Sequence, residues 1–109
     1  SVAGLTAEQR NYCTAVTSWG TSPAADDLKA ANASGDKAAV RAALKAYLAE
    51  TKAMVDSVPA DAPADVKQAY QAVLTAVQAS ANGTITKAQQ DAQTAARPTI
   101  TAYYAGICN

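Results

Sequence analysis

The chain has 109 residues, with 9 basic and 9 acidic side chains and no histidine, and half of it is hydrophobic, with alanine the largest part. This length fits a single domain, and residues 1–109 are expected to form one helical-bundle domain. The balanced charge provides no strong positive field, so no nucleic-acid partner is expected, and no apolar run is long enough to form a transmembrane segment.

The first two helices have recognisable starts. Thr6 followed by Gln9 has the form of a capping box, and apolar residues at helical spacing then continue the helix to Gly20, the expected C-terminal glycine. Ser22-Pro23 predicts a second start, as the N-cap and the first helical residue. This second helix is expected to be short because Asn32–Gly35 breaks it.

The third and fourth helices carry the clearest apolar stripes. Residues from about 36 to 58 hold one stripe at helical spacing, and the turn Pro59–Pro63 ends it. The fourth helix is expected to begin between Asp61 and Ala64. It is expected to end at Asn82-Gly83, since both residues tolerate the left-handed conformation.

The last helix begins with another capping box, at Thr86 and Gln89. Pro98 interrupts it, so a bend is expected near residues 94–97 before Cys108 returns to the first helix. No segment has the pattern of a strand. The sequence therefore predicts an all-α, up-down helical bundle of four longer helices plus one short helix.

Cys13 and Cys108 lie near opposite ends of the chain and are predicted to form a disulfide. The alternative is two unrelated buried thiols, as in a cytosolic protein. The bond is favoured because it would tie down the last helical turn and add about 4 to 5 kcal/mol through loop-closure entropy. Since disulfides persist in oxidising compartments, the bond predicts a secreted or extracytoplasmic location. The start at Ser1-Val2, without Met, is interpreted as a processed end.

The composition gives little support to catalysis. Without histidine the usual general base is missing, and no Ser or Thr lies in a recognisable nucleophile turn, so the chain is not expected to be an enzyme. Zinc and haem ligation also lack support, and no cofactor or metal site is expected. Asp26-Asp27 and the pair Asp61 and Asp65 fit helix starts better than a divalent-cation site.

Lys37, Arg41 and Lys45 recur every four residues and form a basic row on the third helix. Such a row could dock onto anionic envelope polymers or lipid headgroups. The favoured interpretation is a solvated flank of an amphipathic helix, where long basic side chains lay their stems on the neighbouring apolar stripe.

Six side chains supply the aromatic surface. They are Tyr12, Trp19, Tyr47, Tyr70, Tyr103 and Tyr104. The favoured interpretation places each ring at the edge of the bundle with its polar group in water. The alternative is a small pocket for an amphipathic ligand, lined by these residues between the first, third and fifth helices.

Three segments carry a family resemblance. Ser34–Leu44, the turn Pro59–Val66 and the ending Tyr103–Cys108, together with the cysteine of the first helix, resemble small exported helical proteins and lipoproteins of high-GC actinobacteria. The resemblance implies an extracytoplasmic helical bundle with a Cys–Cys link between its ends. It implies no particular activity and no site residues.

These features predict a non-catalytic, secreted or cell-envelope-associated binding module that works through a helical face. Two alternatives are a carrier of a small amphipathic ligand in the aromatic pocket and a self-assembling structural subunit whose alanine-rich faces pack between chains. The expected partner is a protein, an envelope polymer or a small amphipathic ligand.

Overall fold

The computed structural model describes residues 4–109, and its regular structure consists of five α-helices. These are α1 (Ala7–Gly20), α2 (Pro23–Ser34), α3 (Lys37–Asp56), α4 (Ala64–Asn82) and α5 (Lys87–Cys108). The described part of the chain contains no strand, which confirms the predicted all-α class with α2 as its short helix. The expected processed start at Ser1-Val2 lies outside the described residues.

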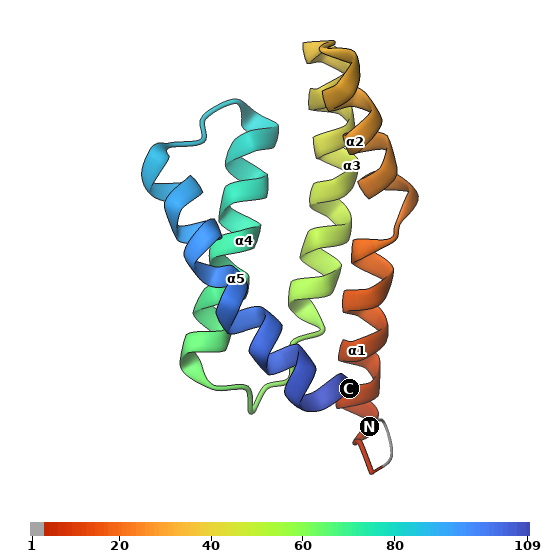
Figure 1. The fold of residues 1–109 in the computed structure, drawn as a ribbon, viewed down its shortest axis with the longest axis vertical. Helices are drawn as coiled ribbons and strands as arrows, with labels where there is room; N and C mark the ends of the chain where they lie inside the picture. The colour runs from red at the N-terminus through yellow and green to blue at the C-terminus, as the bar shows by residue number, and fades with distance from the viewer. Residues whose placement is uncertain (1–3) are drawn as a thin grey trace.

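The helices run up and down along a flat molecule of 46 × 28 × 18 Å. Figure 1 shows α1 and α2 following one another along one side, α3 returning beside them, and α4 running back next to α5. The C-terminal end of α5 crosses to the beginning of α1, so the two ends of the described chain lie close together. Short connections between antiparallel neighbours produce this bundle, as predicted.

The predicted helix starts are confirmed. Thr6 with Gln9, and Thr86 with Gln89, form complete capping boxes in which both reciprocal hydrogen bonds are present. Ser22 caps α2 by accepting a hydrogen bond of 3.1 Å from a backbone amide of its first turn.

Two helix boundaries differ from prediction. Gly20 does not end α1 in the left-handed conformation; it is the last helical residue, and Thr21 follows as the cap with φ −121°. Pro98 does not interrupt the last helix, because α5 continues through it to Cys108; the bend expected near residues 94–97 stays a prediction. The missing proline amide leaves the carbonyl of Thr94 without its helical partner, but both residues are exposed, so water can bind there.

The core is built mainly from small side chains. One buried cluster, between α4 and α5, consists of Ala69, Val73, Val77 and Ala96. Small side chains let the two helices approach closely, but each one buries little apolar surface. The few large buried side chains therefore carry a greater share of the stability.

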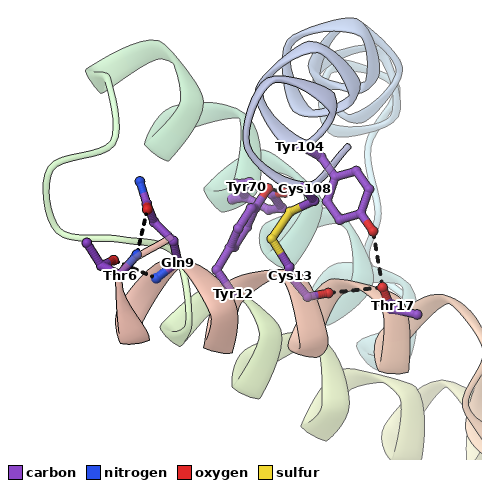
Figure 2. The surroundings of a disulfide bond; sticks show 8 residues. All are labelled: Thr6, Gln9, Tyr12, Cys13, Thr17, Tyr70, Tyr104 and Cys108. Carbon is purple, nitrogen blue, oxygen red and sulfur yellow. Dashed lines mark hydrogen bonds between the residues drawn. A yellow bond between two sulfur atoms is a disulfide. The ribbon is translucent and has the colours of Figure 1, made fainter. Parts of the chain in front are cut away.

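The largest buried side chains meet where α1, α4 and α5 come together. Tyr12 and Tyr70 are 0 % and 1 % exposed, and their hydroxyls share a hydrogen bond. The two rings meet edge-on, with centroids 6.0 Å apart and an interplanar angle of 88°, and they lie next to the disulfide (Figure 2). The ring of Tyr12 also meets the rings of Tyr103 and Tyr104 edge-on, at centroid distances of 5.5 and 6.3 Å.

The predicted disulfide joins Cys13 of α1 to Cys108 at the end of α5. Their Cα atoms are 5.8 Å apart, within the usual range for such a bond. Next to it, the hydroxyls of Thr17 and Tyr104 form a hydrogen bond of 3.1 Å, which also links α1 with α5 (Figure 2). The prediction that one disulfide ties the ends together is confirmed.

Replacing Cys13 with Ser should lower the melting temperature by roughly 15 to 20 °C, because the unfolded chain regains the entropy that the closed loop removes. Circular dichroism melts under non-reducing conditions measure this shift. The variants Cys108→Ser and Cys13→Ser/Cys108→Ser should melt at similar temperatures. A double variant as stable as the oxidised parent would contradict the stabilising role of the bond.

Replacing Tyr12 with Phe should cost about 1 to 3 kcal/mol, because the hydroxyl of Tyr70 then stays buried without a partner. Urea unfolding measures the loss. The double variant Tyr12→Phe/Tyr70→Phe should lose less than the sum of the two single variants, since it leaves no orphaned hydroxyl. Strictly additive losses would show that the two hydroxyls do not act as a pair.

The same tyrosines predict a stability that depends on alkaline pH. Burial raises the pKa of Tyr12 and of Tyr70 above the ordinary value, and the hydrogen bond with Tyr70 raises the pKa of Tyr12 further. A raised pKa in the folded state leaves stability unchanged below about pH 10 and lowers it above, by up to about 1.4 kcal/mol per pH unit for each group. Urea unfolding between pH 9 and pH 11.5 should show this fall, and the double Phe variant should show a shallower one.

Candidate functional site

The basic row of Lys37, Arg41 and Lys45 lies on the first turns of α3, and all three side chains are exposed. Because four residues advance an α-helix by little more than one turn, the three side chains follow one edge of α3. Ala38 and Ala42 lie between them, and the surface there forms an open hollow of about 430 Å³. The small alanine side chains leave room for another molecule to approach the helix backbone.

No acidic side chain interrupts the basic row, because α3 carries neither Asp nor Glu within residues 37–49. Asp36 precedes the row, but its carboxylate accepts hydrogen bonds of 3.0 and 3.3 Å from backbone amides in the first turn of α3. Among residues 4–109 the one salt bridge joins Lys87 to Asp91 on α5. No side chain of the basic row is therefore paired with an acidic group. The chain is neutral as a whole, yet this edge of α3 is positive.

Arg41, in the middle of the row, also reaches the end of α4. Its Nη2 atom lies so close to Gly83 that a Cβ atom on this glycine would be 3.3 Å away. Gly83 has φ 71° and caps α4 by donating its amide hydrogen to carbonyls of the last turn. Since the C-terminal end of a helix carries partial negative charge, it favours a guanidinium at this place. The sequence marked Gly83 as a helix end, but it held no signal for the contact with Arg41.

The six aromatic side chains, whose alternative interpretation was the lining of one pocket, fall into two groups. The favoured interpretation, rings at the edge of the bundle with their polar groups in water, is wrong for Tyr12 and Tyr70, which are buried. Tyr70, Tyr103 and Tyr104 surround Tyr12 beside the disulfide. Trp19 instead stacks on Tyr47, with ring centroids 5.6 Å apart and an interplanar angle of 24°. The first group fills the junction of α1, α4 and α5, whereas the second joins α1 to α3.

Trp19 and Tyr47 pack against the apolar cluster of α4 and α5, and two hydrogen bonds link this aromatic pair to Thr51. The indole nitrogen of Trp19 donates a hydrogen bond of 2.9 Å to Thr51 Oγ1, and that hydroxyl donates one of 2.7 Å to the backbone carbonyl of Tyr47. Burial raises the pKa of Tyr47, and the nearby carboxylate of Glu50 raises it further, while Arg97 acts in the opposite direction. These bonds fix the indole ring on α1 against α3.

The acidic pairs of the sequence lie at or before helix starts. Asp26 is in the first turn of α2 and Asp65 is in the first turn of α4. The helix dipole places partial positive charge at this end, so a carboxylate there is stabilising. Within residues 4–109 no group of three His, Cys, Asp or Glu side chains is placed to hold a metal ion. The helices of this part of the chain also include none that is both long and apolar enough to cross a membrane.

One protein family matches most of the chain. The family KfrA_N, described as "Plasmid replication region DNA-binding N-term", matches residues 7–100. The matched segment runs from the start of α1 into the second half of α5 and includes the whole basic row. No curated protein and no solved structure matches the chain.

This match corrects what the sequence had suggested about identity and function. The resemblance to exported helical proteins and lipoproteins of actinobacteria is wrong. The predicted secreted or envelope-associated binding module, with its alternatives of a ligand carrier and a structural subunit, is contradicted as well.

The expectations about partner and location are also wrong. Nucleic acid was excluded on net charge, but a sum over the whole chain hides a local row such as Lys37, Arg41 and Lys45. The secreted location rested on the disulfide, and a DNA-binding family contradicts it. The bond between Cys13 and Cys108 establishes that two sulfur atoms meet, which does not by itself identify a compartment.

The fold and the family match concern the same residues. The match covers all of α1 to α4 and more than half of α5, so it extends over the complete helical framework around the basic row. The chain therefore belongs to the KfrA_N family, the family described as a DNA-binding N-terminal domain of plasmid replication regions.

Proposed function

We propose that this domain binds double-stranded DNA and that the basic row on α3 contacts its phosphates. The observation that carries the proposal is the row itself, in which Lys37, Arg41 and Lys45 are exposed on one helix edge with no acidic residue between them. Contacts between basic side chains and phosphates supply most of the sequence-independent affinity of DNA-binding proteins. The description of the family supports the same partner.

The dimensions of the row suit a DNA backbone. From Lys37 to Lys45 the helix rises about 12 Å, and over that length one strand of B-DNA places roughly three or four phosphates. An α-helix with small side chains on its outer face is also narrow enough for the major groove, which is about 12 Å wide. Ala38 and Ala42 supply such a face between the basic residues.

Arg41 differs from its two lysine neighbours in position and in chemistry. Its guanidinium lies beside Gly83 at the C-terminal end of α4. A planar guanidinium can donate two parallel hydrogen bonds to one phosphate, which a lysine ammonium cannot. The bidentate phosphate contact is therefore assigned to Arg41, and the lysines add charge on either side.

The neutral net charge is compatible with this function. Salt screens exposed charges beyond about 8 Å at physiological ionic strength, so a phosphate on the row senses mainly the charges next to it. Asp36 is the acidic group nearest to the row in sequence, and its carboxylate is already engaged by backbone amides. The strongest phosphate contacts are therefore assigned to Arg41 and Lys45, farther from that carboxylate.

We propose no catalytic step for this domain. The sequence contains no histidine, and the basic row offers positive charge but no nucleophile beside a base. Its chemistry is the neutralisation of anionic groups.

Replacing Lys37, Arg41 and Lys45 together with Gln should weaken binding to a 20-base-pair duplex at least tenfold in 100 mM salt, because three phosphate contacts are lost. Fluorescence anisotropy with a labelled duplex measures the affinity. The matched control replaces Lys67, Lys87 and Arg97, which are exposed on α4 and α5, with Gln and removes the same charge. Equal losses in both triple variants would show that the row is not the interface.

The salt dependence of binding counts the phosphate contacts. The logarithm of the affinity should fall with the logarithm of the salt concentration with a slope of about −3, near −0.9 for each neutralised phosphate. Replacing Lys45 alone with Gln should make the slope shallower by about 1. Titrations between 50 and 200 mM salt measure it, and a slope near zero would refute contact through phosphates.

A further inference from the structure

A second hollow lies on the other flank of α3, where this helix faces α1. Its volume is about 190 Å³. It is lined by Ala15, Ser18 and Trp19 from α1 and by Glu50, Ala53 and Met54 from α3. The lining combines an aromatic ring, a thioether and methyl groups with a single ionisable side chain.

Glu50 carries the unusual feature of this hollow. Its Oε2 atom is shielded from solvent and has no hydrogen-bond partner within the described part of the chain. Buried polar atoms are almost always paired, since removing a carboxylate oxygen from water without a partner is costly. No basic side chain lines the hollow, and no salt bridge of residues 4–109 involves Glu50. This oxygen therefore has neither a hydrogen-bond donor nor a paired counter-charge within residues 4–109, and the other oxygen of the carboxylate is left to bind a ligand in the hollow.

Trp19 provides the other half of a cation site. Its indole N–H is bonded to Thr51 and its ring is stacked on Tyr47, so the ring is held in position beside Glu50. Aromatic rings attract cations through the negative charge of their faces, most strongly in tryptophan. A carboxylate and an indole lining one hollow are thus suited to a positively charged group with an apolar stem.

We infer that this hollow between α1 and α3 binds a small primary alkylammonium ion, whose N–H groups donate to Glu50 and whose alkyl chain lies against Trp19 and Met54. The hollow holds the volume of roughly six water molecules at about 30 Å³ each, which suits a chain of about four carbons with its nitrogen. A quaternary ammonium ion has no N–H to donate, and an anion would be repelled.

This site does not depend on the proposed DNA binding. Arg41 approaches α4, whereas Glu50 faces α1, so the two sites use different flanks of α3. Loss of one can therefore be measured without loss of the other.

The test uses the single tryptophan of the chain as its reporter. Tryptophan fluorescence is followed while n-butylammonium chloride is added at constant ionic strength, with n-butanol and tetramethylammonium chloride as comparison ligands. We expect a saturable change with n-butylammonium at millimolar concentration and binding at least tenfold weaker for the other two. An unsaturable response to n-butylammonium, or binding of n-butanol or tetramethylammonium as tight as that of n-butylammonium, overturns the proposal.

Two variants test separately the contribution of the Glu50 charge and the contribution of the free space in the hollow. Glu50→Gln removes the charge, and Ala53→Leu keeps the charge but fills the hollow; each should weaken n-butylammonium binding at least tenfold. Asp56→Asn removes an exposed carboxylate of the same helix and should change binding by less than twofold. Melting curves confirm that each variant is folded. Unchanged binding in a folded Glu50→Gln variant, or an equal loss in Asp56→Asn, refutes the site.

Discussion

The buried hydrogen bond between the hydroxyls of Tyr12 and Tyr70 is the interaction on which the arrangement of the helices depends most directly. In a core made largely of alanine and valine, with Met54 as the other large buried side chain of the same cluster, these two rings join α1 to α4. The disulfide and the neighbouring tyrosines then fix α5 at the same junction. With the helices held at this end, α3 needs no large side chain on its outer face. The basic row and its alanines lie on that face.

Local rules explain why much of the fold was predictable. A capping box such as Thr6 with Gln9, or a Ser22-Pro23 start, involves residues only a few positions apart. All the partners of the interaction can therefore be read from one short stretch of sequence. Gly20 and Pro98 were misjudged because their effect depends on what surrounds them. The environment of Pro98 is solvent, which can satisfy the backbone group that the proline frees.

The candidate sites were less predictable because they arise from contacts across the fold. The basic row and the absence of acidic residues within it were visible in the sequence, but the contact of Arg41 with Gly83 requires the position of α4. The unpaired oxygen of Glu50 was invisible for the same reason, since its burial depends on α1 packing against α3. Sequence spacing places residues on one helix face, but it does not reveal which neighbouring helix covers that face.

The disulfide has a topological consequence as well as an energetic one. Because it joins residues 95 positions apart, nearly the whole polypeptide forms a covalent ring from α1 to the end of α5. A protease that cuts one loop within this ring leaves two fragments that stay attached through sulfur, with every helix still present. A cut at the exposed turn between α4 and α5, for example, would leave all five helices in one covalently connected molecule with new chain ends at that turn.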